Sequence, residues 1–174
     1  MTTLTHDTYV LFLVAGTTYA LPSADVRHME MVEQITPVPN ATECLEGVVF
    51  SRGQVVPVLN LRVRFGFERA PHDLGTRLLV VQSGERWVGL LVDSAREFVR
   101  IPRDAIQPPS AAMAALSAGY LDGIATLGER LVLVLNVAGT IAVTAGTIPP
   151  SLPGQALPGP TVRNEDARVQ SRRD

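Results

Sequence analysis

The sequence predicts a mainly β protein, arranged as barrels or as a sandwich. Short apolar runs recur at regular spacing along the chain, and turns rich in glycine and proline separate them. Hydrophobic residues make up 46% of the 174 residues, which is enough to build a real core. Two segments also resemble each other, so the chain is predicted to contain two related β units.

The first half of the chain is predicted to form four strands and one short helix. The strands correspond to the apolar runs at 10–14, 18–21, 48–50 and 55–61. Pro22 can open a short helix over 23–29, because proline is tolerated in the first turn. The segment 32–38 is expected to be extended, since Pro37 and Pro39 disfavour a helix there.

The second half is predicted to be built largely from hairpins. The expected strands are 77–82, 87–92, 97–101, 123–127 and 131–137. Gly84 supplies the turn of one hairpin and Gly128 the turn of another. Ser110 can cap a small apolar helix that reaches residue 116, and we expect this helix to pack on the barrels.

The composition changes after about residue 143. Several prolines and glycines precede a charged end, and such a segment buries too little apolar surface to offset the entropy of ordering it. We therefore expect a folded domain over 9–143, with a first β unit at about 9–74 and a second at about 75–143. Residues 144–174 are predicted to be a disordered tail.

Charge and aromatic content disfavour a nucleic-acid-binding small-barrel module. Such a module needs a basic face with exposed aromatic rings, whereas the net charge is −2 and Phe, Trp and Tyr total 5%. No apolar stretch reaches the roughly 18 residues of a membrane span. The first residues also lack the basic region that opens a signal peptide. We expect a cytoplasmic protein with no nucleic-acid partner and no direct membrane insertion.

The sequence shows no candidate catalytic, cofactor or metal site. The single cysteine, Cys44, excludes an intramolecular disulfide and a cysteine-based zinc site. No Asp or His cluster stands at metal-ligand spacing around His28, and no Gly-x-Ser-x-Gly, Walker or Gly-x-Gly-x-x-Gly motif occurs. Since hydrolysis and phosphoryl transfer need a positioned base or metal, we expect a protein that is not an enzyme and binds no cofactor.

An internal repeat organises the chain. The segment 45–61 (LEGVVFSRGQVVPVLNL) aligns without gaps with 121–137 (LDGIATLGERLVLVLNV), at a constant spacing of 76 residues. The identical pairs are Leu45/Leu121, Gly47/Gly123, Val56/Val132, Val58/Val134, Leu59/Leu135 and Asn60/Asn136. A weaker similarity joins 20–29 to 89–98. Duplication of a strand–turn–strand unit explains this pattern, and chance similarity between two apolar hairpins is the alternative.

Arg52 stands out within the repeat. The turn 51–54 reads Ser-Arg-Gly-Gln, and the second copy has Gly128 in place of Arg52. Gly53 satisfies the backbone of the turn, and strand packing accounts for the matched residues, but neither accounts for Arg52. Arg52 is either an exposed turn residue without a partner or a charged contact to another protein, and arginine is enriched at binding hot spots.

Four residues are predicted to shape turns and strand ends: Gly47, Gly53, Pro57 and Gly89. Pro57 cannot donate a hydrogen bond to a neighbouring strand. Its strand is therefore expected to lie at a sheet edge or to be locally bulged.

From about residue 9 to 142, the chain resembles the CheW family, the adaptors of bacterial chemoreceptor arrays. The resemblance is carried by 47–53 (GVVFSRG), 56–62 (VPVLNLR), 88–93 (VGLLVD) and 120–123 (YLDG). The sequence departs from the usual family pattern at Phe50 and Ser51, where the family has Asn-Leu. An acidic residue often stands where this chain has His28.

The resemblance implies two SH3-like five-stranded β-barrels packed together across a hydrophobic interface. It also implies a non-catalytic scaffold that couples the regulatory domain of a CheA-type histidine kinase to the cytoplasmic tips of methyl-accepting chemoreceptors, in arrays at the inner membrane. An adaptor of a divergent, non-flagellar chemosensory pathway is the alternative within the family. By analogy, the expected protein-binding residues are Arg52, Val26, His28, Leu78, Leu79 and Val80.

Overall fold

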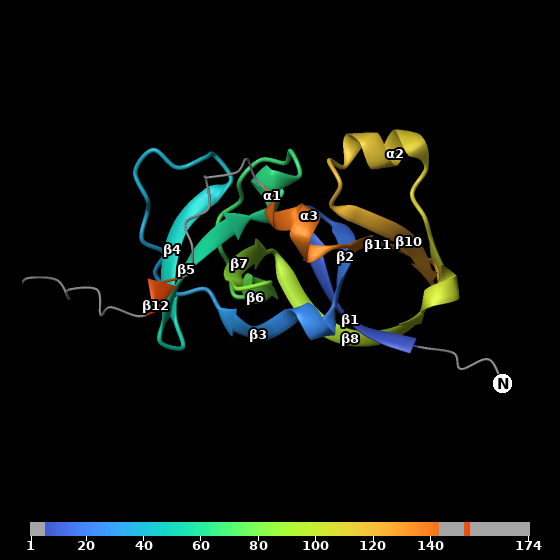
Figure 1. Ribbon diagram of the computed structural model, residues 1–174, viewed down its shortest axis with the longest axis horizontal. Coiled ribbons are helices and arrows are strands. Elements are labelled where there is room, and N and C mark those ends of the chain that lie inside the picture. The colour runs from blue at the N-terminus through green and yellow to red at the C-terminus, as the bar shows by residue number, and fades with distance from the viewer. Residues whose placement is uncertain (1–5, 143–151, 154–174) are drawn as a thin grey trace, which may run out of the picture.

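Strands dominate the computed structural model, which describes residues 6–142 and 152–153 (Figure 1). The strands are β1 (His6–Val14), β2 (Thr17–Pro22), β3 (Val26–Met31), β4 (Leu45–Ser51), β5 (Gln54–Asn60), β6 (Arg77–Ser83), β7 (Arg86–Val92), β8 (Ser94–Pro102), β9 (Ile106–Gln107), β10 (Leu121–Leu127), β11 (Arg130–Leu135) and β12 (Leu152–Pro153). The helices are α1 (Leu61–Arg64), α2 (Ala111–Leu116) and α3 (Val137–Ile141), with single 3₁₀ turns at Ser23–Asp25 and Arg103–Ala105. The predicted mainly β fold with short helices is confirmed.

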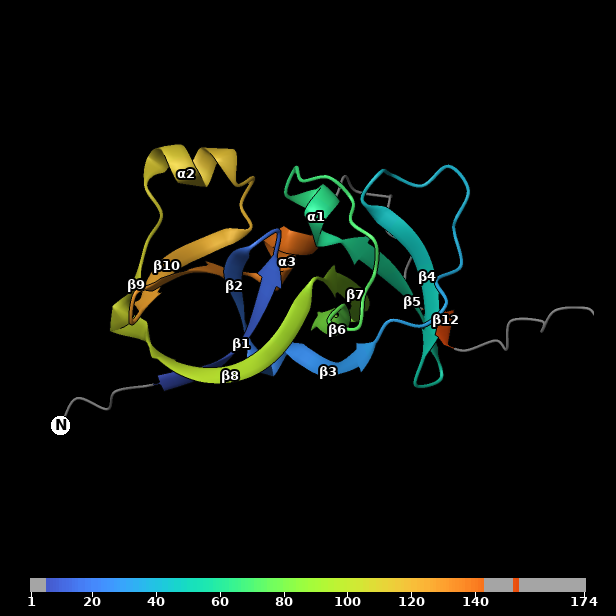
Figure 2. The ribbon, with the colours of Figure 1, turned by 180° about the vertical axis from the view of Figure 1, so that it is seen from behind.

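The strands form two sheets that lie side by side (Figures 1 and 2). The first sheet has the order β8-β1-β2-β11-β10-β9. The second has the order β12-β5-β7-β6-β3, with β4 paired to the other side of β5. No helix in the described part of the chain is long and apolar enough to cross a membrane.

Each half of the sequence contributes strands to both sheets. β1 and β2 lie in the first sheet together with β8, β9, β10 and β11. β3, β4 and β5 lie in the second sheet together with β6 and β7. The chain changes from one sheet to the other directly after two of its hairpins. After the β1–β2 hairpin, β3 pairs with β6 in the second sheet, and after the β6–β7 hairpin, β8 pairs with β1 in the first sheet. The predicted boundary near residue 75 therefore divides the sequence repeats and does not separate the sheets.

Side-chain alternation buries both faces of the central strands. Along β1, Tyr9 and Leu11 enter a core within the first sheet, while Val10 and Phe12 enter a larger core shared with the second sheet. β6 follows the same rule between the shared core and the core of the second sheet. This shared core is the hydrophobic interface expected between two packed barrels.

The sequence repeat is also a repeat of structure. Gly47 in β4 and Gly123 in β10 each follow the same shift in strand register. A Cβ at Gly47 would lie 2.1 Å from the carbonyl oxygen of Thr36, and one at Gly123 would lie 2.8 Å from that of Gln107. The two glycines therefore serve the same purpose, the close approach of a neighbouring backbone.

Matched asparagines end the repeated hairpins. The side chains of Asn60 and Asn136 cap α1 and α3 by accepting a hydrogen bond from the backbone N–H three residues on. Their Nδ2 atoms donate to Glu46 Oε1 and Asp122 Oδ1, both at 2.8 Å. Equivalent side-chain networks at equivalent positions favour duplication over chance similarity.

The structure corrects two predicted elements. The helix predicted over 23–29 is a single turn at Ser23–Asp25, and Val26–Met31 is strand β3. This segment is a strand because of its tertiary contacts. It pairs with β6, and this pairing provides hydrogen-bonding partners for the backbone groups of β6 at the edge of a largely buried sheet. The strand predicted over 55–61 ends at Asn60, where the asparagine cap starts α1.

The helix α2 begins as predicted but does not pack as predicted. Ser110 caps it, since its Oγ accepts a hydrogen bond from the N–H of Met113 at 3.3 Å. Every residue of Ala111–Leu116 is exposed, and Leu116 is 85% exposed. Figure 1 shows the helix standing apart from the strands. The expected packing of this helix on the barrels is therefore wrong.

Of the four predicted turn residues, Gly53 lies in a hairpin turn and the others lie within strands. Gly47 is in β4, Pro57 in β5 and Gly89 in β7. A Cβ at Gly89 would lie 2.8 Å from Leu78 Cδ1, so any other residue there would force the buried Leu78 side chain to shift. Gly47 and Gly89 thus serve close packing within strands and not turns.

β5 has neighbours on both sides, so it is not an edge strand along its whole length, but on the side away from β4 neither β7 nor β12 pairs with it at Pro57. The N–H and C=O of Val48 both bond Thr36, at 2.8 and 2.9 Å, on the far side of β4. The Val48–Pro57 pair is therefore a non-hydrogen-bonded pair, and Pro57 needs no N–H toward β4. On the other side, β7 pairs with β5 only from Val58 onward, so the missing donor is not needed there either.

The predicted disordered tail lies outside the described residues, except for Leu152–Pro153. These two residues form β12, with Leu152 opposite Val55 and Pro153 opposite Gln54 of β5.

Candidate functional site

Arg52 occupies the tip of the β4–β5 hairpin. Ser51 pairs with Gln54, and the two residues between them have φ values of 46° at Arg52 and 82° at Gly53. Two consecutive positive φ angles are typical of a type I′ turn, which favours Asn-Gly because its first position is also left-handed. Arginine is unfavourable there by roughly 1 kcal/mol, since its Cβ crowds the following carbonyl. The backbone thus does not explain Arg52.

The Arg52 side chain is directed to the surface. Residue 52 is exposed, and it makes no hydrogen bond or ion pair with any residue that the structure describes. Its guanidinium group is therefore available to an external carboxylate, which it can bind through two parallel hydrogen bonds.

A polar cluster lies behind the turn. The Nε2 of His28 is 2.9 Å from Ser51 Oγ and 3.3 Å from Glu30 Oε2. Ser51 Oγ donates its proton to Glu30 Oε2 at 3.1 Å, so it can accept from a protonated Nε2 of His28. β3 supplies His28 and Glu30, and β4 supplies Ser51, which joins two strands that do not pair with each other.

The charge state of His28 is set by its surroundings. The His28 side chain is 6% exposed. Burial lowers the pKa of the imidazole below its ordinary value, and the positive charge of Arg52 lowers it further, against the opposing charge and hydrogen bond of Glu30. A neutral imidazole therefore supports Ser51 at the base of the hairpin.

A cleft of about 370 Å³ opens beside the turn. Apolar side chains stand at its rim, since Met31 is 58% exposed and Phe50 is 53% exposed. The lining combines these with acidic, polar and basic groups: Glu30, Met31, Glu33, Gln34, Thr36, Val49, Phe50, Ser51, Arg52 and Leu78. We call this lining, with Arg52 at its edge, the Arg52 surface. Exposed apolar groups beside a free arginine are typical of a protein contact.

Not all of the predicted binding residues reach this surface. Arg52 lies on it, and the buried His28 supports it from below. Val26 is half-buried against the shared core. Leu78, Leu79 and Val80 are between 0% and 2% exposed, because they lie on a central strand with both faces covered. The three are core residues, which corrects their assignment as contact residues, although Leu78 forms the floor of the cleft.

Two apolar rim residues, Met31 and Phe50, are not among the residues predicted from the sequence to bind a partner. Met31 follows the segment predicted as a helix, so its place beside the hairpin was not foreseen. Phe50 carried a signal, because it stands in an otherwise apolar strand beside Arg52 at a position that departs from the family pattern. The strand alternation points Phe50 to the side opposite its buried neighbours Val49 and Ser51.

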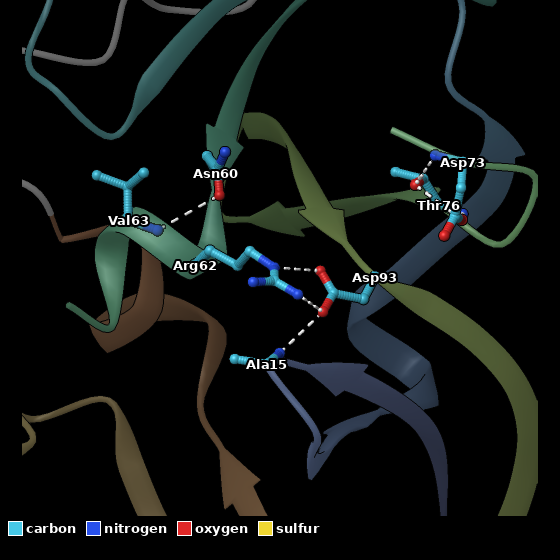
Figure 3. Close-up of polar contacts among 7 residues, drawn as sticks. All are labelled: Ala15, Asn60, Arg62, Val63, Asp73, Thr76 and Asp93. Carbon is cyan, nitrogen blue, oxygen red and sulfur yellow. Dashed lines mark hydrogen bonds and ion pairs between the residues drawn. The ribbon is translucent and has the colours of Figure 1, made fainter. Parts of the chain in front are cut away.

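A second polar centre is structural (Figure 3). Arg62 in α1 donates from Nε to Asp93 Oδ1 at 2.8 Å and from Nη2 to Oδ2 at 2.6 Å. The same Oδ2 accepts from the backbone N–H of Ala15 at 2.9 Å. Asp93 thus pairs with an arginine that lies half-buried in α1.

Asp93 is held as a carboxylate. Partial burial on its own would raise the pKa of Asp93, but the hydrogen bonds from Arg62 and Ala15 and the positive charge of Arg62 outweigh it and hold the pKa below its ordinary value. The hydrogen bond to Asp93 also raises the pKa of Arg62. The pair joins α1 to the β7–β8 junction and to the β1–β2 turn.

The fold and this surface define a class of small β proteins built from two packed sheets, with an exposed charged hairpin as the distinctive feature. Within the described ranges, no three His, Cys, Asp or Glu side chains are placed to hold a metal ion. Residues 8–144 match the family described as CheW-like domain, and the chain therefore belongs to this family.

Individual relatives agree with this assignment. The chain is 27% identical over 129 residues to the chemotaxis protein CheW of Klebsiella aerogenes, covering 74% of this chain and 78% of that one. It is 30% identical over 131 residues to the chemotaxis protein CheW of Helicobacter pylori, with the same coverage. The crystal structure of scaffolding protein TtCheW from Thermoanaerobacter tengcongensis superposes with a TM-score of 0.74 at 25% identity, covering 83% of this chain and 98% of that one.

Proposed function

We propose that this protein is a non-catalytic scaffold that couples a CheA-type histidine kinase to chemoreceptors. One surface would hold the regulatory domain of the kinase, and another would hold the cytoplasmic tip of a methyl-accepting receptor. Membership of the CheW-like family and the relatives named for chemotaxis support this proposal. The protein would work in the cytoplasm, in receptor arrays at the inner membrane, and without a cofactor.

The mechanism follows from bivalent binding. A scaffold that holds two partners makes their mutual encounter intramolecular, so two weak contacts assemble a stable array. Two packed sheets joined by a shared core suit this task, because they fix the relative positions of two surfaces. No chemical step is needed.

The observation that carries the proposal is the state of Arg52. This arginine is exposed, holds an unfavourable left-handed backbone and makes no bond with the described part of the chain. Met31 and Phe50 offer apolar area beside it. A flat cation next to apolar side chains is the usual composition of a binding hot spot, and we assign it to the receptor or the kinase.

The test is a binding assay with a purified kinase regulatory domain and a purified receptor cytoplasmic fragment. Arg52→Ala is expected to weaken binding to one partner by about tenfold or more, because truncating a hot-spot residue costs at least about 1–2 kcal/mol. Arg86→Ala is the matched control, since Arg86 is also an exposed arginine at a hairpin turn. The control is expected to bind both partners normally.

Two results would contradict the proposal. Unchanged affinities and unchanged kinase activation in Arg52→Ala would remove Arg52 from the interface. A pulldown from native cells that recovers neither a histidine kinase nor a chemoreceptor would remove the scaffold function. Recovery of a kinase that controls a response other than flagellar motility would instead identify a divergent chemosensory pathway.

A further inference from the structure

The edge of β5 beside Arg52 is only partly covered by its neighbouring strands. β4 pairs along one side of β5, from Leu59 to Gln54. On the other side, β7 pairs only with Val58–Asn60. The segment Gln54–Pro57 therefore lies outside the part of β5 that β7 pairs with. A strand edge of this kind can accept another extended segment through backbone hydrogen bonds.

Val55 provides the hydrogen-bonding groups on this edge. The Val48–Pro57 pair is non-hydrogen-bonded, because Val48 directs its N–H and C=O to Thr36. The Phe50–Val55 pair lies two residues along the same unshifted ladder, so it has the same geometry. The N–H and C=O of Val55 therefore point away from β4 toward the open edge, where Pro57 offers no N–H of its own.

The chain's own C-terminal segment lies on this edge. β12 runs antiparallel to β5, with Leu152 opposite Val55 and Pro153 opposite Gln54. Both ribbon views show β12 beside the β4–β5 hairpin (Figures 1 and 2). Of the two residues of β12 only Leu152 carries an N–H, so β12 can donate only one backbone hydrogen bond to β5. A pairing this short is specific in register but easily displaced.

We propose that the segment at Leu152–Pro153 is a built-in competitor strand, which occupies the β5 edge and lowers the access of the partner protein to the Arg52 surface. Gln54, opposite Pro153, also pairs with Ser51 across the turn, so the segment ends within two residues of Arg52. The competitor role rests on the proposed function of Arg52, whereas the docking of the segment on β5 does not.

The tail supplies its own control, because the tripeptide Leu-Pro-Gly occurs twice, at 152–154 and at 157–159. Leu152→Pro removes the one N–H that β12 can donate, and Leu157→Pro makes the same change outside β12. In the full chain, amide hydrogen exchange at Val55 is measured by NMR. We expect exchange to accelerate roughly fivefold in Leu152→Pro, the factor expected for one net backbone hydrogen bond, and to be unchanged in Leu157→Pro.

The same variants are then titrated with the kinase regulatory domain and the receptor fragment. Leu152→Pro is expected to bind the Arg52-dependent partner roughly twofold to fivefold more tightly than the wild type. Equal Val55 exchange in both variants would overturn the docking. Faster exchange with unchanged affinity would overturn the competitor role alone. Failure of the wild type to bind either partner would count against the proposed function and the competitor role. The docking of β12 on β5 would still be decided by the hydrogen exchange of Val55.

Discussion

At the scale of single residues, Arg52 shows how a local rule and a binding role can conflict. The hairpin requires left-handed backbone at two consecutive positions, and Gly53 meets this requirement without strain. Arg52 adopts this conformation at a cost in free energy, which asparagine or glycine at the same position would avoid. Natural proteins keep such unfavourable residues mainly at functional positions, so the conflict supports the assignment of Arg52 to a partner.

Replacing Arg52 with asparagine should therefore stabilise the protein while weakening its binding. We expect Arg52→Asn to raise the free energy of unfolding by roughly 0.5–1 kcal/mol, because asparagine tolerates the left-handed conformation. Urea unfolding measures the change, and Arg86→Asn serves as the control, with no gain expected. A loss of stability in Arg52→Asn would mean that the Arg52 side chain holds the hairpin together.

Gly47 is the glycine for which we expect the largest mutational cost. A Cβ there would lie 2.1 Å from the carbonyl oxygen of Thr36, and the φ of 147° also disfavours other residues. We expect Gly47→Ala to lower the free energy of unfolding by about 3 kcal/mol or more. Gly84→Ala, with a φ of 61° and nothing within 4 Å, should cost about 1 kcal/mol. Equal losses of unfolding free energy in the two variants would show that the backbone at Thr36 can move away from the added Cβ at little cost.

At the scale of elements, the short helix α1 is held by one ion pair and by an asparagine cap. Arg62 binds Asp93 through two hydrogen bonds, and Asp93 also accepts from Ala15. Four residues of helix would not persist alone, since a single turn does not offset the cost of nucleation. The Asn60 cap and the Arg62 pair therefore determine where α1 lies.

The Arg62–Asp93 pair gives a pH-dependent prediction. We expect Arg62→Met to lose about 1–3 kcal/mol of stability at neutral pH, as for a hydrogen bond to a charged group. The folded pKa of Asp93 lies below its ordinary value of 3.8, so the contribution is present above pH 3.8 and is lost as the pH falls through the folded pKa. The stabilities of wild type and variant, measured by denaturant unfolding, should converge in acid.

The control for this pair is Arg103→Met. Arg103 pairs with Asp7 at 2.7 Å, but its side chain is 70% exposed, so we expect no measurable loss. A difference between wild type and Arg62→Met that persists in strong acid would show that Arg62 acts through packing of its stem and not through its charge.

At the scale of the whole molecule, the exchange of strands predicts one cooperative unit. The two sheets share a core and each contains strands from both halves of the chain, so neither can unfold while the other stays intact. The single tryptophan, Trp87, is in β7 and reports on the second sheet. We expect its fluorescence and the NMR signals of β10 and β11 in the first sheet to show the same urea midpoint.

A shared-core substitution sharpens this test. Leu90→Ala should lower both midpoints together and cost about 2–5 kcal/mol, because Leu90 is fully buried in the shared core. A midpoint that shifts for Trp87 but not for the first sheet would show that the sheets unfold separately.

Local patterns predicted part of the candidate site and missed the rest for a physical reason. The turn chemistry of 51–54 predicted that Arg52 and Gly53 lie at a hairpin tip, and the structure places them there, since a hairpin tip depends on its own residues. The resemblance predicts that 78–80 lies on a contact surface, whereas the structure buries it, because an apolar run does not show whether one or both faces of its strand are buried. The pairing of β3 with β6, which brings His28 to Ser51, is equally invisible in local sequence.

The sequence by itself determined the mainly β fold, the repeated hairpins with their glycines and asparagines, and the exposed arginine at one turn. These features depend on side-chain alternation and on backbone preferences within a few residues. Only the tertiary structure decided which strands exchange between the sheets, which apolar runs are buried on both faces, and which segments meet beside Arg52. Those outcomes depend on pairing between residues far apart in the chain, where many partners satisfy the same local pattern and the shared core selects among them.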